Sequence, residues 1–399
     1  MKRLLTVFIV LVLSYPQQSF AAPKPVTVKE VALLATDANA EGVLALGNQV
    51  ITYANQSNAT ADISITSRDT SGLTVWTKVI DSERDEIASA IAADGKGAVW
   101  LAGVSAAAST PDTSTVVGPV SNPDGVSTEK PQVTRRDLTE ISLWQLSPAG
   151  ELLSTYTTTL GTAGLVTAIS VSTSGVSVVG SKTGGVFIVS ASTTGVFSKV
   201  ISFGTSKTTI NSIARASDGG HYLVGSSAET LGGKKPVGAR DGVLIKVSKT
   251  GALSTVVRSS ASGASRSWNC STANLFSVGD VKSSKSSEVA ITKFTTSFTP
   301  TWTMRLPSSG ANACSIGAAG SFHAAFTQSS AIKGFSGVKA TKGQGVILTI
   351  DSKGSIKGAV SNSAMGQPLA LSYSPGNGIA LLASGIGANP SSIFYLKTR

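Results

Sequence analysis

Basic residues in three segments of the C-terminal half are the side chains of this sequence best suited to bind a ligand. The 399-residue chain has a formal net charge of +11 at pH 7. A basic surface favours anionic partners such as wall polymers, membrane surfaces or nucleic acid. The candidate ligand-binding residues are Lys234, Lys235, Arg240, Arg266, Lys333, Lys339 and Lys342. They predict binding of an anionic cell-envelope polymer or of another surface protein; the alternative is a solvated rim of loops.

Two further groups of residues bear on metal binding. Asp81, Glu83 and Asp85 have the spacing that begins a calcium loop, but no glycine occupies the sixth position and no acid the twelfth. Calcium at these three residues is therefore a secondary hypothesis beside a solvated acidic loop. His221 and His323 are the only histidines, and no spaced set of cysteines or carboxylates accompanies them. We expect two histidines on strand faces, no metal centre and no cofactor.

An internal repeat defines the elements that must position these residues. The stretch Thr209–Val257 contains four short β-type runs, with tight turns at Ser217–Gly220 and Ser248–Gly251. Glycine, aspartate and serine favour such turns, because they tolerate positive φ or bond to their own backbone. The pattern recurs as six complete four-strand sets and a final set of three strands. Internal repeats of this kind define the architecture of a chain.

The incomplete last set predicts how the chain closes. Val26–Leu34 is a strand-like run without a set of its own, and we expect it to supply the missing strand. Closure removes the exposed edges that a sheet protein must otherwise protect. The predicted fold is an all-β, seven-bladed β-propeller of four-stranded antiparallel blades over residues 22–399. A long loop insertion is expected at residues 105–136.

The second strand of several sets ends in a glycine that follows small and apolar residues. This pattern appears at Trp100–Gly103, Val178–Gly180, Leu223–Gly225 and Ser277–Gly279. With D-x-x-G before it and D-x-x-L-x-K-x-S-x-x-G after it, it resembles the bacterial seven-bladed β-propeller repeat, often called the SBBP repeat. The resemblance covers most of the mature chain and is clearest in the second and fourth sets. It implies an architecture and not an activity.

The geometry of a four-strand blade then predicts on which face of the ring each loop lies. The turns after strands one and three lie on one face of the ring, and the other connections lie on the opposite face. The tight turns belong to the first class, whereas the variable loops Ser105–Arg136, Ser227–Arg240 and Ser329–Gln344 belong to the second. Variable loops on a rigid scaffold are where binding usually occurs. We therefore expect the binding surface on the variable-loop face.

Cys270 and Cys314 are the only cysteines, and we predict that they form a disulfide. Aligned on the repeat, both lie on first strands, which are the inner strands of adjacent blades. Their separation can then fall in the range of about 4.4–6.8 Å that a disulfide requires between Cα atoms. The alternative is two reduced cysteines packed as small apolar residues.

The first 21 residues predict an export signal. Lys2 and Arg3 precede a short apolar run from Leu4 to Leu13, and small residues at Ser19 and Ala21 suit cleavage. No later run approaches the roughly 20 apolar residues of a membrane helix. The mature chain is expected to be secreted, or extracytoplasmic, without a transmembrane segment. Export and the lack of interleaved aromatic residues argue against nucleic acid as a partner.

The preferred hypothesis is that the chain is a secreted, non-catalytic binding or scaffold protein that recognises an anionic envelope or extracellular ligand. No catalytic residue is assigned, because the sequence has neither a G-x-S-x-G elbow nor a paired-carboxylate or histidine-centred set. The alternative is an extracellular hydrolase or lyase acting on polysaccharide, with carboxylates that converge from different blades. The sequence leaves the ligand and the oligomeric state open.

Overall fold

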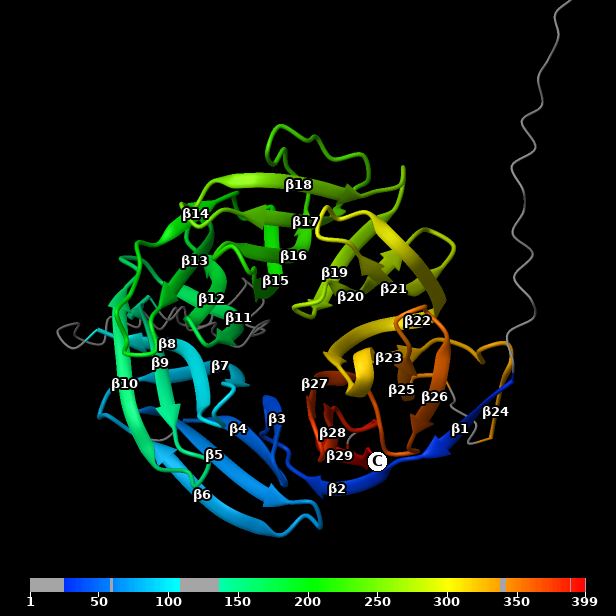
Figure 1. Cartoon of the computed structure of the whole chain (residues 1–399), viewed down its shortest axis with the longest axis horizontal. Helices are drawn as coiled ribbons and strands as arrows, with labels where there is room; N and C mark the ends of the chain where they lie inside the picture. The colour runs from blue at the N-terminus through cyan, green and yellow to red at the C-terminus, as the bar shows by residue number, and fades with distance from the viewer. Residues whose placement is uncertain (1–24, 58–59, 108–135, 338–341, 388, 399) are drawn as a thin grey trace, which may run out of the picture.

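The chain folds into a ring of antiparallel β-sheets (Figure 1). A computed structural model describes residues 25–57, 60–107, 136–337, 342–387 and 389–398. The expected export signal and nearly all of the expected insertion at 105–136 lie outside these residues. No helix in the described part of the chain is long and apolar enough to cross a membrane.

Five sheets contain four strands each and form separate blades. Second strands such as β8 and β16 are buried along almost their whole length, because neighbouring blades cover both of their faces. Outer strands such as β6 and β10 alternate between exposed and partly buried residues, as expected for a sheet with one solvated face. The strands are β3 (Gly42–Leu46), β4 (Gln49–Ser57), β5 (Ala61–Asp69) and β6 (Thr74–Ile80); β7 (Glu86–Ala93), β8 (Val99–Ala106), β9 (Leu138–Leu146) and β10 (Leu152–Thr159); β11 (Gly164–Ser172), β12 (Gly175–Lys182), β13 (Gly185–Ala191) and β14 (Ile201–Phe203); β15 (Thr208–Arg215), β16 (His221–Ser227), β17 (Asp241–Val247) and β18 (Leu253–Ser259); and β27 (Pro368–Ser374), β28 (Gly378–Ala383), β29 (Ser392–Lys397) and β2 (Ala32–Thr36).

The remaining strands form a single nine-stranded sheet, so five blades rather than the predicted seven are separate. The cause is β22 (Pro300–Ile316), which pairs with β21 up to Pro307 and with β23 from Ser308 onward. No loop interrupts this strand; its register shifts on both sides of Gly310, whose φ is 110°. The prediction of an all-β propeller with four-stranded antiparallel blades is confirmed. The predicted number of separate blades, seven, is wrong, since five are separate. The other strands of this sheet are β19 (Ser265–Ser271), β20 (Phe276–Lys282), β21 (Ser287–Phe294), β23 (Phe322–Gln328), β25 (Gly345–Ile350), β26 (Ile356–Ser361), β1 (Val26–Glu30) and β24 (Phe335–Gly337).

The N-terminal run forms two strands instead of the one expected at Val26–Leu34. β2 pairs antiparallel with the C-terminal strand β29, with Ala32 opposite Tyr395 and Leu33 opposite Phe394. β1 pairs in parallel with β26 and β24 of the nine-stranded sheet. Between them Val31 is buried, and its amide bonds to the carbonyl of Ser361. The run therefore ties the last sheet to its neighbour as well as completing it.

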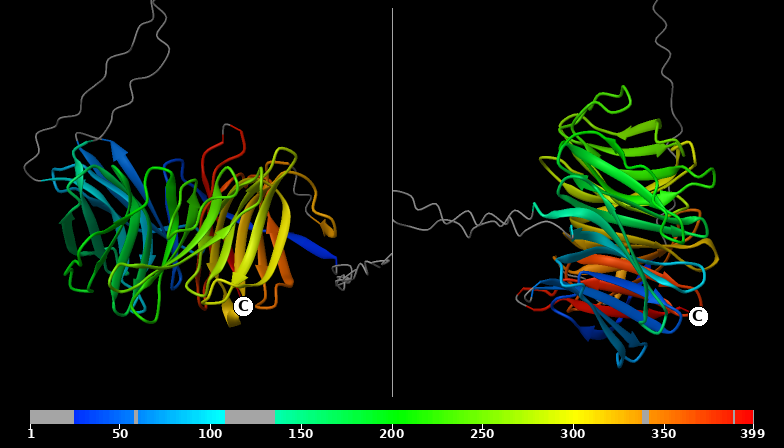
Figure 2. Two further views of the ribbon diagram at one scale, coloured as in Figure 1. Left: turned by 90° about the horizontal axis from the view of Figure 1, so that it is seen from above. Right: turned by 90° about the vertical axis from the view of Figure 1, so that its left-hand side faces the viewer.

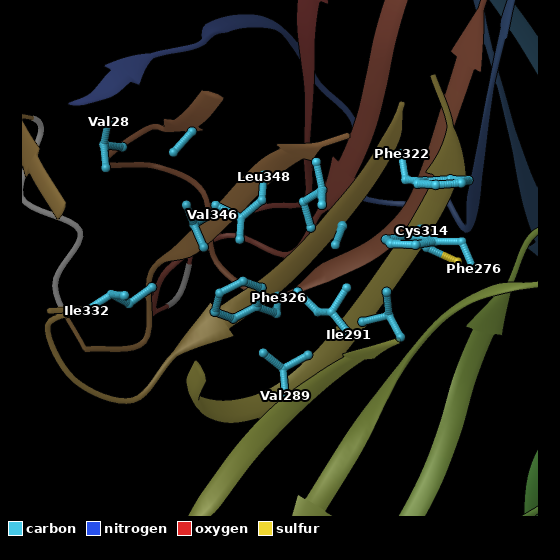
Figure 3. Close-up of a cluster of buried hydrophobic side chains, with 14 residues drawn as sticks. Val28, Phe276, Val289, Ile291, Cys314, Phe322, Phe326, Ile332, Val346 and Leu348 are labelled. Carbon is cyan, nitrogen blue, oxygen red and sulfur yellow. The ribbon is translucent and has the colours of Figure 1, made fainter. Parts of the chain in front are cut away.

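The inner strands contact one another in a closed cycle: β3, β7, β11, β15, β19, β22, β27 and again β3. Apolar clusters fill the spaces between neighbouring sets. In one of them, Phe276 stacks on Phe322 with ring centroids 4.5 Å apart, and Val28 of β1 lies at its outer end (Figure 3). This cluster joins two sets within the nine-stranded sheet, and similar clusters join neighbouring four-stranded sheets, so apolar burial between sets holds the ring together.

The recurring glycine of the second strand has a steric cause. A Cβ at Gly225 would lie 2.0 Å from the carbonyl oxygen of Thr209, and one at Gly103 would lie 1.9 Å from that of Ile87. Both contacts come from the inner strand of the same sheet, beside a β-bulge. Gly180 and Gly279 meet the corresponding carbonyls at 2.1 and 2.0 Å. Only glycine allows the bulged inner strand to approach this closely.

The strands run between the two faces of the ring, seen edge-on in Figure 2. The expected tight turns occupy one face, and the side chain of the first turn residue accepts hydrogen bonds from amides later in the turn. Asp94 accepts hydrogen bonds from the amides of Lys96 and Ala98, and Ser147 does the same for Ala149 and Glu151. The connections after second and fourth strands therefore occupy the opposite, variable-loop face.

Candidate functional site

A buried ion pair organises the loop between β16 and β17 on the variable-loop face. The Asp241 side chain is fully buried, and its Oδ2 lies 3.4 Å from Nη1 of Arg258. Asp241 also accepts hydrogen bonds of 2.9 Å from the amides of Val237 and Gly238. Burial alone would raise the pKa of Asp241, but these amides and Arg258 lower it overall. The carboxylate stays charged and fixes the end of the loop.

Arg258 holds the same loop from the other side. Its Nε donates to the carbonyl of Lys234 at 3.1 Å and its Nη1 to that of Ser227 at 3.3 Å. Its Nη2 donates to the carbonyl of Glu229. A guanidinium can serve several acceptors at once because its donors form a planar fork. Arg258 therefore has a structural role in fixing the loop, and its guanidinium group is buried.

Glu229 is the acid of this loop, and its carboxylate is used internally. It accepts hydrogen bonds from the amide of Thr205 at 2.7 Å and from the hydroxyl of Thr208 at 2.5 Å. Burial acts to raise the pKa of Glu229, but the hydrogen bonds from Thr208 and Thr205 lower it overall. The carboxylate thus joins the loop to the preceding crossover connection.

Four of the seven predicted binding residues lie together around this loop. Lys234 and Lys235 are exposed, and Arg240 is partly buried with Nη1 3.1 Å from Oγ of Ser226. The carbonyl of Arg240 accepts a hydrogen bond of 2.9 Å from the amide of Arg266. We call these residues, Lys234, Lys235, Arg240 and Arg266, the basic loop cluster.

The other predicted residues lie elsewhere. Lys333 and Lys342 are exposed in the connection between β23 and β25, whose strand β24 pairs with β1. In Figure 1 this connection is well separated from the loop between β16 and β17. Lys339 lies outside the described residues. The predicted binding residues thus form two groups.

A pocket of about 230 Å³ lies beside Arg266, where the end of β18 faces the set β19–β22. Arg266 and Arg305 provide its cationic part, and Trp268 and Phe294 meet edge-to-face with centroids 5.3 Å apart. Arg305 is not among the predicted binding residues, because an arginine on an outer strand has the pattern of an ordinary solvated side chain. The remaining lining residues are Ser259, Ser267, Asp280, Val281, Ala290, Thr292, Pro300 and Thr303.

The two histidines are buried in the sheets and take part in hydrogen bonds. Nε2 of His221 lies 3.0 Å from Oγ of Ser177 and 3.2 Å from Oγ of Ser190. Nδ1 of His323 lies 3.2 Å from Oγ1 of Thr349. Desolvation lowers the pKa of each histidine to about 4. Ser177 is fully buried, so this serine–histidine contact has no access for a substrate.

The carboxylates of Asp81 and Asp85 accept hydrogen bonds from backbone amides. Asp81 accepts a hydrogen bond from the amide of Glu83 at 2.9 Å, and Asp85 from the amide of Ala61 at 2.6 Å. Within the described residues, no group of three or more His, Cys, Asp or Glu could hold a metal ion. Calcium at Asp81, Glu83 and Asp85 has gained no support.

The disulfide between Cys270 and Cys314 is confirmed. It joins β19 to β22, and the two Cα atoms are 5.8 Å apart. The sulfur atoms lie on inner strands of consecutive sets, as the repeat alignment predicted. The alternative of two reduced cysteines is wrong.

Comparison with known proteins identifies the fold and no family. No family model matches the sequence, and no curated protein matches it. The resemblance to the SBBP repeat therefore stays a prediction. A chain of a mitotic checkpoint complex is similar over 100% of this chain and 99% of its own, with 8% identity and a TM-score of 0.51.

Two further solved structures are more distant. The β-propeller domain of the trilobed protease from Pyrococcus furiosus matches 91% of this chain and 96% of its own, with 6% identity and a TM-score of 0.48. A protein of unknown function from Bacteroides caccae matches 66% and 87%, with 10% identity and a TM-score of 0.39. The identity of 8% to the checkpoint-complex chain bears on the fold alone.

Proposed function

We propose that this protein is an extracytoplasmic, non-catalytic propeller that binds an anionic envelope or extracellular polymer through its variable-loop face. The observation that carries the proposal is the bracing of the loop between β16 and β17. Asp241 and Arg258 fix its backbone, and Lys234 and Lys235 are left exposed on it. A preorganised cationic loop loses little conformational entropy when a polymer binds.

The compartment is part of the same proposal. Residues 1–21 have the pattern of an export signal, and the disulfide favours an oxidising compartment. Envelope polymers that carry carboxylates or phosphates are the anionic ligands to be found there.

We also propose that the nine-stranded sheet consists of two blades fused through β22, which gives a ring of seven. The closed cycle of seven inner strands supports this count. Gly310, where the register of β22 shifts, then marks the border between the two blades.

Binding to immobilised polygalacturonate at low salt tests the function. The double variant Lys234→Ser/Lys235→Ser is expected to weaken binding several-fold, because two exposed charges leave the loop. The matched control is Lys96→Ser/Lys353→Ser, which removes the same charge from exposed tight turns on the opposite face. Equal effects of the two double variants would show that net charge, and not the basic loop cluster, governs binding.

A further inference from the structure

The pocket between β18 and the set β19–β22 combines two chemical surfaces in one small volume of about 230 Å³. Two guanidinium groups line one part, and aromatic and aliphatic side chains line another. We propose that this pocket binds a compact amphipathic carboxylate, with the carboxylate at Arg266 and Arg305 and the apolar body against Trp268 and Phe294. This goes beyond the proposed function, since the ligand is a small molecule or chain end and not a polymer.

Arg266 is the principal cation of the pocket. Its Nη1 donates to Oγ of Ser259 at 3.0 Å, and within the described residues it has no ion pair. Burial lowers the pKa of Arg266, and the neighbouring positive charge of Arg305 adds to this effect. The two guanidinium groups therefore repel each other, and an anion placed between them would relieve that repulsion.

Arg305 supplies the second cation from the outer strand β22. Its Nη1 lies 3.3 Å from Oε2 of Glu288, and the two side chains are 40% and 33% exposed. An exposed ion pair of this kind is weak, so Arg305 can turn to a ligand carboxylate. Glu288 offsets one of the two arginines, and Asp280, whose carboxylate oxygens accept hydrogen bonds of 2.8 Å from Asn269 and Asn312, also lines the pocket. The pocket therefore matches a ligand with no more than one negative charge.

The apolar part of the pocket selects the rest of the ligand. Trp268 and Phe294 are 5% and 4% exposed, and their rings meet at an interplanar angle of 86°. Val281, Ala290 and Pro300 complete this surface. An inorganic anion would leave this apolar surface unused, whereas a phenyl-sized group would bury its own apolar area in the pocket together with the exposed ring of Pro300. Arginine pairs well with carboxylates because both groups are planar and bidentate.

Two sources share this chemistry: a free aromatic or branched carboxylic acid, and the C-terminal residue of a peptide. Isothermal titration calorimetry with 3-phenylpropanoate tests the first, and a short peptide ending in phenylalanine tests the second. 3-Phenylpropanamide and the amidated peptide lack the charge, and acetate lacks the apolar body. We expect at least one of the two carboxylates to bind and all three analogues to bind at least about tenfold more weakly. No measurable binding of either carboxylate, or equal binding of acid and amide, would overturn the proposal.

Substitutions locate the site. Arg266→Gln and Arg305→Gln should each weaken carboxylate binding about tenfold, the usual scale for a charge-assisted hydrogen bond. Glu288→Gln should strengthen it severalfold, because the competing carboxylate is removed. The matched control is Arg84→Gln, since Arg84 forms an ion pair of the same 3.3 Å length with Glu140 in another sheet. An unchanged affinity in Arg305→Gln and Glu288→Gln would overturn the assignment, whatever the stability of Arg266→Gln.

Discussion

Arg258 and Arg266 show that residues of one type, a few positions apart, can differ in role. Arg258 is enclosed by loop carbonyls and Asp241, whereas Arg266 lines a pocket and forms no ion pair with any residue that the structure describes. Both lie near the ends of strands, and nothing in their immediate sequence separates them. The difference depends on the carboxylate of Asp241 and on the path of the loop, which are tertiary features.

The two buried histidines predict how stability depends on pH. The pKa of His221 and His323 is about 4 in the folded protein and about 6.5 in an unfolded chain. The unfolded state therefore binds more protons between these values, and stability falls as the pH falls through this window. At about pH 5 each histidine should cost about 2 kcal/mol relative to neutral pH.

Urea unfolding at several pH values measures this effect. The double variant His221→Gln/His323→Gln should lose most of the pH dependence between about pH 4 and about pH 6.5. If the native protein is equally stable at both ends of this window, the histidines are not desolvated as described.

Among the strands and turns, the repeat could be predicted from the sequence because each set of four strands contains its own turn residues. The tight turns were predicted from Asp, Ser and Gly, and the hydrogen bonds of Asp94 and Ser147 confirm the reason. The fifth set lacks a glycine in its turns, and Leu275 and Phe298 adopt positive φ there instead. Both side chains are buried, so packing offsets the backbone strain.

The fusion of two sets through β22 could not be predicted in the same way. The residues before Gly310 are serines, which also occur in the loops of this chain. Whether they form a loop or continue a strand depends on pairing with β23 and not on local propensity. The pocket beside Arg266 is likewise a product of two sheets and leaves no local pattern in the sequence.

The recurring glycine gives a prediction for a single strand. Gly225→Ala should destabilise the fold by about 2 kcal/mol, because its methyl group would overlap the carbonyl of Thr209 and force the bulge apart. Gly95→Ala is the control, since nothing lies within 4 Å of a Cβ there and its φ is not positive. Thermal unfolding of both variants measures the difference; similar melting temperatures would remove the steric explanation of the repeat.

At the scale of the whole molecule, closure depends on segments that are distant in sequence. β2 pairs with β29, β1 joins the neighbouring sheet, and the disulfide links β19 to β22. The N-terminal run was predicted to close the ring, but its division into two strands was not. The division follows from the buried Val31 between them, whose amide bonds to Ser361.

Two deletions separate the roles of these strands. Removing residues 22–30 takes away β1 and should lower the melting temperature moderately, because Val28 leaves an apolar cluster. Removing residues 22–36 also takes away β2 and should lower it much further, since the edge of β29 becomes exposed. Equal melting temperatures for the two deletions would contradict the role of β2 in closure.

The proposed binding of an anionic polymer to the variable-loop face depends on the braced loop between β16 and β17. Hydrogen–deuterium exchange of the native protein, with and without polygalacturonate at low salt, tests where the polymer lies. Binding there should slow exchange in residues 228–240 and leave it unchanged in the tight turns at Ser147–Gly150 and Ser248–Gly251, which lie on the opposite face. Slower exchange confined to those turns, or none in residues 228–240, would contradict it.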